Sequence, residues 1–149
     1  MNILKVSLAL VLAVCIGQET TAQSKKINLE TSAIEWVGKK ITGAHNGSIK
    51  FISGSLQFDG DKLKGGQFQV DMTSITVLDL QAGRGKEKLE GHLKNDDFFG
   101  VDKYPTSTLV FKTVKDNGSG NYTITADLTI KGITKPVTFD LAVSNGRAR

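Results

Sequence analysis

The stretch 121-NYTITADLTIKGITKPVTFDLAVS-144 alternates apolar and polar residues over most of its length. Apolar side chains occupy every second position in two sets: Ile124, Ala126, Leu128 and Ile130, then Val137, Phe139, Leu141 and Val143. Because successive side chains of a β-strand point to opposite faces, this period predicts two strands with one dry and one wet face. Such strands are typical of antiparallel sheets.

The same period recurs earlier in the chain. The segment 66-GQFQVDMTS-74 places three apolar side chains on one face, and 33-AIEWVGKKI-41 places Ile34 and Trp36 on one face. Recurrent strands with short polar turns predict an all-β domain, a meander closed into a barrel or folded into a sandwich. Gly and Asn tolerate the positive φ of tight turns, which predicts turns at three segments: 45-HNGS-48, 59-DGDKLKGG-66 and 116-DNGSGN-121.

One segment, residues 80–103, interrupts the alternation and is rich in charge. Within it, 86-KEKLEGHLK-94 places Leu89 and Leu93 four residues apart, on one face of a short helix. We expect this helical excursion to continue to about residue 100 and to lie across one end or face of the domain. Its second turn would have two carboxylates as a cap and carry two rings: Asp96 and Asp97, then Phe98 and Phe99.

The chain begins with the features of a signal peptide. A start with one lysine precedes the apolar run 6-VSLALVLAVCIG-17, and 20-TTA-22 has the small residues of a cleavage site before Gln23. We therefore predict a signal peptide at 1–22 and one exported domain at 23–149, in the periplasm or secreted. Lipid attachment at the cysteine of the apolar run is disfavoured, because a valine precedes it where lipoprotein signals have Gly, Ala or Ser.

Composition excludes several kinds of chemistry. Cys15 is the only cysteine, so the mature domain has neither a disulfide nor a thiolate nucleophile. The net charge of +4 is modest and spread along the chain, and together with export it argues against a nucleic-acid partner. A mildly basic surface does suit anionic head groups, and we expect transient membrane contact.

Two candidate sites contain titratable or basic residues. His92 and Asp96 are four residues apart, but His45 is the only other histidine and no HExxH pattern occurs. The sequence therefore predicts no metal site, no cofactor and no catalytic residue; hydrogen bonding or capping is the preferred role of His92, with a metal site or general-base catalysis as alternatives. The loop 82-AGRGK-86 is interpreted as a flexible basic loop, or as a site for an anionic head group held by Arg84 and backbone N–H groups.

Six aromatic residues lie in strand segments, mostly on faces predicted to be dry: Trp36, Phe51, Phe58, Phe68, Phe111 and Phe139. Each taken singly is interpreted as ordinary core. As a set inside a small barrel they would instead line a cavity, because such barrels either fill with side chains or hold one small ligand.

Four segments together resemble one known family: 84-RGKEKLEGHLKNDDFFGVDKYPTSTLVF-111, 127-DLTIKGITKPVTF-139, 43-GAHNGSIKFISGSLQFD-59 and 70-VDMTSITVLD-79. They resemble, in order and spacing, the YceI-like domain family of polyisoprenoid-binding proteins. The resemblance implies an elongated, lipocalin-like antiparallel β-barrel with a helix around an apolar tunnel. It also implies a periplasmic or envelope protein that binds an isoprenoid, a quinone or another long-chain lipid and is not an enzyme.

The residues and the resemblance together give an expected binding site. Head-group contacts are expected from Arg84 and His92. Family members run on into further strands, whereas this chain ends at 145-NGRAR-149, so we expect a barrel that is incomplete at its C-terminal end. The tunnel lining is expected to comprise thirteen apolar residues: Trp36, Phe51, Phe58, Phe68, Val70, Leu89, Leu93, Phe98, Phe99, Phe111, Leu128, Ile130 and Phe139.

Two other functions stay open at this point. One is a hydrolase or isomerase that acts on such a lipid with His92 and a nearby Asp. The other is an envelope module that contacts proteins, or a second copy of the chain in a homodimer, through an unpaired sheet edge.

Overall fold

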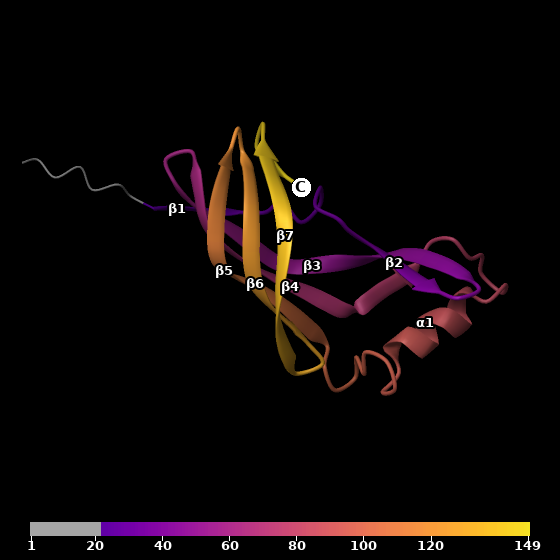
Figure 1. Ribbon diagram of the computed structural model, residues 1–149. Helices are drawn as coiled ribbons and strands as arrows, with labels where there is room; N and C mark the ends of the chain where they lie inside the picture. Colours follow the sequence, from indigo (N-terminus) through magenta and orange to yellow (C-terminus); the bar gives the residue numbers. More distant parts are fainter. Residues whose placement is uncertain (1–21) are drawn as a thin grey trace, which may run out of the picture.

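Long strands with alternating side chains form one antiparallel sheet in the computed structural model, which describes residues 22–149 (Figure 1). Apart from Ala22, the predicted signal peptide lies outside the described residues. The strands are β1 (Gln23–Lys26), β2 (Ile34–Lys40), β3 (Gly43–Asp59), β4 (Lys62–Val77), β5 (Thr106–Gly118), β6 (Asn121–Ile130), β7 (Ile133–Ser144) and β8 (Arg147–Ala148).

The sheet follows the order β1-β3-β4-β5-β6-β7-β8, and β2 pairs with the first half of β3 while β1 pairs with its second half. Every pairing is antiparallel. The sheet curls into a half-barrel (Figure 1). The all-β prediction is therefore confirmed, including the alternation along β6 and β7. Among the residues described, no helix is long and apolar enough to cross a bilayer.

An irregularity in β4 redirects the end of that strand. Asp71 Oδ1 accepts hydrogen bonds from the Thr73 N–H at 2.9 Å and the Thr73 hydroxyl at 2.6 Å. The Ser74 hydroxyl donates to the Asp71 carbonyl and accepts the Lys50 N–H at 2.8 Å. These side chains replace the sheet bonds that the register shift removes, so β4 continues past the bulge.

The helix α1 (Lys86–Lys94) forms as predicted but ends sooner than residue 100. Asn95 is extended, and the chain then reverses through hydrogen-bonded turns: the Gly100 N–H donates to the Asn95 carbonyl at 2.8 Å. Gly100 has φ 55°, which favours glycine. Asp96 therefore caps no second helical turn, and its carboxylate instead pairs with Lys103 at 2.6 Å.

The predicted turn at 45-HNGS-48 is wrong, because these residues lie inside β3 and the chain turns at residues 41–42. Gly47 is there for close approach. A Cβ on Gly47 would lie 1.9 Å from the Thr76 carbonyl oxygen and 2.4 Å from the Trp36 ring. The glycine lets the indole lie directly on the strand.

The apolar residues form two separate groups. The trough cluster lies on the concave face of the sheet, and its buried members are Leu56, Phe58, Leu63, Tyr122, Ile124 and Ala126. The helix cluster lies where α1 meets the far end of β4, and it comprises Ile75, Val77 and Leu93 with Trp36, Ile49, Leu80, Leu89 and Phe99 packed against them.

Candidate functional site

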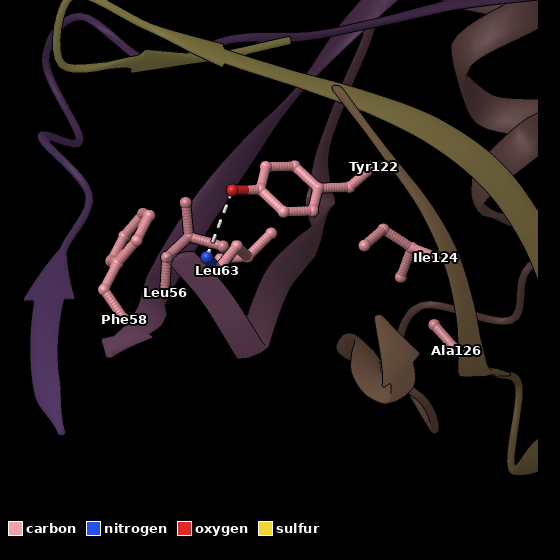
Figure 2. Packing of buried hydrophobic residues seen from close by; sticks show 6 residues of the cluster. All are labelled: Leu56, Phe58, Leu63, Tyr122, Ile124 and Ala126. Atoms are coloured by element: carbon pink, nitrogen blue, oxygen red, sulfur yellow. Dashed lines mark hydrogen bonds between the residues drawn. The ribbon is translucent and has the colours of Figure 1, made fainter. Parts of the chain in front are cut away.

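The candidate site is the concave face of the half-barrel, here called the trough. Tyr122 on β6 extends across it, and its hydroxyl accepts a hydrogen bond from the Leu63 N–H on β4 at 3.2 Å (Figure 2). Strands β4 and β6 are separated by β5, so this contact exists only because the sheet curls. Lys62 and Asp116 pair at 2.5 Å beside it, on the exposed rim. One end of the trough is thereby closed.

A row of four phenylalanine rings crosses the trough from β3 to β7. Ring centroids of Phe51 and Phe68 lie 5.8 Å apart, those of Phe68 and Phe111 lie 5.8 Å apart, and those of Phe111 and Phe139 lie 5.9 Å apart. Ala126 of β6 stands opposite Phe111, and its small side chain leaves room for the last two rings to meet across β6. These distances are those of attractive aromatic pairs.

Glycines on neighbouring strands make space for these rings. A Cβ on Gly54 would lie 2.5 Å from the Phe68 ring, and one on Gly66 would lie 2.8 Å from the Phe111 ring. Both rings therefore lie flat over the backbone of the adjacent strand. The missing side chains of Gly54 and Gly66 leave the space that these two rings occupy.

The trough is apolar but not filled. Eight apolar side chains that pack against its buried cluster keep part of their surface exposed: Phe68, Leu109, Phe111, Val114, Val137, Phe139, Leu141 and Val143. In a filled core such residues would be fully buried. The exposed apolar area is therefore available to a ligand.

A hollow of about 630 Å³ adjoins the ring row, because its lining includes Phe68 and Gly54. Its lining includes Gln67, Gln69, Thr108 and Val110. These residues alternate with the trough residues of β4 and β5, so they face away from the ring row. The lining also includes the apolar side chains of Ile27, Leu29 and Ile52, so the hollow has both polar and apolar walls beside the ring row.

The structure divides the predicted tunnel lining. The trough holds Phe51, Phe58, Phe68, Phe111 and Phe139, with Val70, Leu128 and Ile130 half-buried on the corresponding faces of β4 and β6. The other residues lie elsewhere. Four of them belong to the helix cluster: Trp36, Leu89, Leu93 and Phe99. Phe98 is 45% exposed and belongs to neither cluster.

The predicted head-group residues lie away from the ring row. Arg84 is exposed on the loop before α1, and His92 is exposed on the helix with its ring 5.8 Å from that of Phe98. Asp96 pairs with Lys103, and among the described residues no hydrogen bond or ion pair joins His92 to an aspartate.

Another histidine does meet a carboxylate. His45 Nδ1 lies 2.9 Å from Asp79 Oδ2, and the Asn46 N–H donates to the same carboxylate at 3.2 Å. Partial burial opposes ionisation of Asp79, but the hydrogen bonds from His45 and Asn46 outweigh it and lower its pKa. Within residues 22–149, no three His, Cys, Asp or Glu side chains come together as a metal site.

Sequence reasoning missed Glu90, which attaches α1 to the sheet. Its Oε1 accepts hydrogen bonds from the Val77 N–H at 2.9 Å and the Thr76 hydroxyl at 2.7 Å. Both bonds lower the pKa of Glu90, and the bond from the Val77 N–H has the larger effect. No local spacing signals them, because the partners lie on another element.

Comparisons of sequence and of structure both find known proteins that are similar to this chain. The sequence pattern of the YceI-like domain matches residues 26–149. A UPF0312 protein of Shewanella denitrificans is 36% identical over 92 residues, which are 62% of this chain and 46% of that protein. A UPF0312 protein of Pseudomonas putida is 34% identical over 104 residues, which are 70% of this chain and 51% of that protein.

The chain thus spans about half the length of the curated relatives it matches. Among solved structures, the crystal structure of Burkholderia cenocepacia BcnA is similar, with a TM-score of 0.67 and 26% sequence identity. The similarity covers 80% of this chain and 72% of that one. The curled sheet is therefore shared with a relative of known structure.

Proposed function

The chain belongs to the YceI-like domain family, and from this premise we propose that it is an exported binding protein that carries one polyisoprenoid or other long-chain amphiphile in its trough. The observation that carries the proposal is the row of half-buried rings from Phe51 to Phe139, flanked by further partly exposed apolar side chains. A flexible hydrocarbon chain laid along this surface would cover it and leave the water.

The energetics of burial suit this cargo. Each buried CH₂ contributes about 0.8 kcal/mol, so one five-carbon prenyl unit contributes roughly 3 to 4 kcal/mol before ordering costs. Micromolar affinity requires about 8 kcal/mol. A few prenyl units in the trough therefore suffice, and an isoprenoid, a quinone tail and a fatty chain share the required chemistry.

A polar head group would lie at an edge of the trough. Lys25 of β1 lies at such an edge, with its Nζ 5.0 Å from the ring centroid of Phe58. Arg84 and His92 lie toward the helix and would be reached only by a cargo that extends past the ring row. Lys25 is thus a better candidate than either for contact with a phosphate or hydroxyl head group.

The test is displacement of a fluorescent long-chain probe, dansyl-undecanoic acid, from the purified chain by geranylgeraniol. Phe139→Asp places a charge in the trough, whereas Thr138→Asp places it one residue away on the exposed outer face of β7. We expect Phe139→Asp to lose probe binding and Thr138→Asp to keep it, because a buried unpaired charge is costly.

Two controls keep this test decisive. Circular dichroism and urea unfolding establish that each variant is folded. If Phe139→Asp does not fold, Val137→Thr takes its place, because it is a near-isosteric polar change in the trough. Equal binding by the folded trough and outer-face variants would contradict the proposal. Turnover of geranylgeraniol or its phosphate by the chain would favour the enzymatic alternative instead.

A second candidate function rests on the edge of β7. Its residues Ile133–Ala142 pair with β6 on one side, and on the other side the only strand partner among residues 22–149 is β8, at Val143 and Ser144. An unpaired edge offers hydrogen bonds to a strand of another protein or a second copy. A mass that rises with concentration in light scattering, and that no longer does so in Thr138→Pro, would support this function.

A further inference from the structure

The turn between β2 and β3 carries apolar side chains without cover. Ile41 at the turn is 106% exposed, and Val37 on the strand that leads to it is 65% exposed. Leu78, 58% exposed, lies beside them: its N–H donates to the Asn46 carbonyl at 2.9 Å, and Asn46 stands opposite Val37 in the hairpin. Three exposed apolar side chains therefore share one end of the molecule.

The same end is basic. Lys39 and Lys40 directly precede Ile41, and the neighbouring loop carries Arg84. None of the ion pairs within residues 22–149 involves these three cations. The carboxylate that the hairpin does contact, Asp79, is already bound by His45. The tip thus presents positive charges without ion-pair partners around the apolar side chain of Ile41.

The base of the hairpin is fixed. Strand β2 pairs with β3 from Ile34 to Lys40 without a register shift. The Trp36 indole lies on Gly47 and donates to the Ser48 carbonyl at 3.3 Å. The His45–Asp79 contact ties the other strand of the hairpin to the segment after β4. The hairpin therefore has a fixed base and extends away from strands β5, β6 and β7 (Figure 1).

We propose that this tip, residues 37–45, docks onto anionic membrane surfaces. Ile41 enters the boundary between head groups and acyl chains, while Lys39 and Lys40 contact lipid phosphates. Apolar residues framed by lysines are the composition of interfacial anchors, and each lysine near an anionic bilayer contributes attraction. The purpose of docking rests on the proposed function, since a lipid carrier must meet the bilayer, but docking itself is measured on vesicles that contain no cargo.

The first experiment follows the environment of the tip. In a Cys15→Ser chain, an NBD label is placed by Ile41→Cys, with a matched label by Ser119→Cys at the β5–β6 turn. With vesicles of phosphatidylglycerol and phosphatidylcholine, we expect a blue-shifted emission, quenched by brominated acyl chains, from the label at 41 and none from that at 119. No shift at 41, or equal shifts at both positions, would overturn the proposal, because either result would show that the tip does not enter the bilayer in preference to the rest of the domain.

The second experiment tests the charges. Lys39→Gln with Lys40→Gln removes two tip cations, and at about fivefold per lysine partition onto these vesicles should fall about 30-fold. Lys112→Gln with Lys115→Gln makes the same change in net charge on β5 and should leave partition nearly unchanged. Equal losses in the two pairs would mean that net charge alone drives binding, and the proposal would be abandoned.

Failure of docking and failure of cargo binding remain distinguishable. The vesicle experiments contain no isoprenoid, and the probe displacement contains no vesicles. If the chain binds geranylgeraniol but its tip stays in water, the proposed function is supported and membrane docking by the tip is wrong.

Discussion

The Tyr122 hydroxyl accepts the Leu63 N–H across the curled sheet at 3.2 Å, and both residues are almost completely buried (Figure 2). The bond joins strands that are not neighbours. It gives the Leu63 N–H an acceptor where the register of β3 and β4 shifts. Because the phenol also fills the end of the trough, Tyr122 fixes both the curvature and the closed end.

Removing this hydroxyl should be costly. Tyr122→Phe leaves a buried N–H without its acceptor, and we expect the free energy of unfolding to fall by about 1 to 3 kcal/mol. Urea unfolding followed by circular dichroism measures the change. Tyr104→Phe is the matched control, since Tyr104 is 38% exposed and its substitution should change stability little. Equal effects in the two variants would contradict a structural role for the Tyr122 bond.

Attachment of α1 should depend on pH through Glu90. Its hydrogen bonds hold its pKa below the ordinary value of 4.5. A carboxylate whose pKa is lowered by folding contributes stability above the unfolded pKa and loses it as the pH falls through the folded pKa. We therefore expect local opening of α1, measured by amide hydrogen exchange, to become easier as the pH falls below about 4.5.

Two variants isolate this effect. Glu90→Gln should make α1 open more easily at neutral pH and remove the acid dependence, because the amide does not ionise. Glu87→Gln, on the same helix but bonded to Gly83 instead of the sheet, should retain the dependence. An unchanged pH profile in Glu90→Gln would assign the effect to other carboxylates.

The ring row should be sensitive to the glycine beneath it. Gly66→Ala places a methyl group 2.8 Å from the Phe111 ring and 3.0 Å from a Leu56 methyl, so the ring must move. Overpacking of this kind costs about 1 to 3 kcal/mol. We expect weaker cargo binding together with reduced thermal stability. Gly91→Ala, on α1 with open space around its Cβ position, is the control and should leave cargo binding unchanged.

The strands could be predicted from local period, and the site only in part. The alternation at 121–144 indicated both β6 and β7 and their inward residues correctly, because one face of each is dry. The turn at 45-HNGS-48 was wrong because glycine also serves close packing, and nothing local shows that the Trp36 ring lies over Gly47. The helix was predicted, but its end at Lys94 depends on turns that follow it.

The limits at the site have the same cause. That Phe68, Phe111 and Phe139 are inward was predictable, but their assembly into a row requires the order of the strands and the small residue at Ala126. Predicting one tunnel also merged two environments. The bulge around Asp71 sends the end of β4 toward α1, so the apolar side chains of the helix form a second cluster.

The most direct test of cargo binding is native mass spectrometry of the chain purified from its own host, followed by organic extraction and identification of what is released. We predict one long-chain lipid per chain, retained in Thr138→Asp and lost in folded Phe139→Asp. A folded chain recovered without any lipid, or one whose adduct persists in both variants, would contradict the assignment of the trough as the binding site.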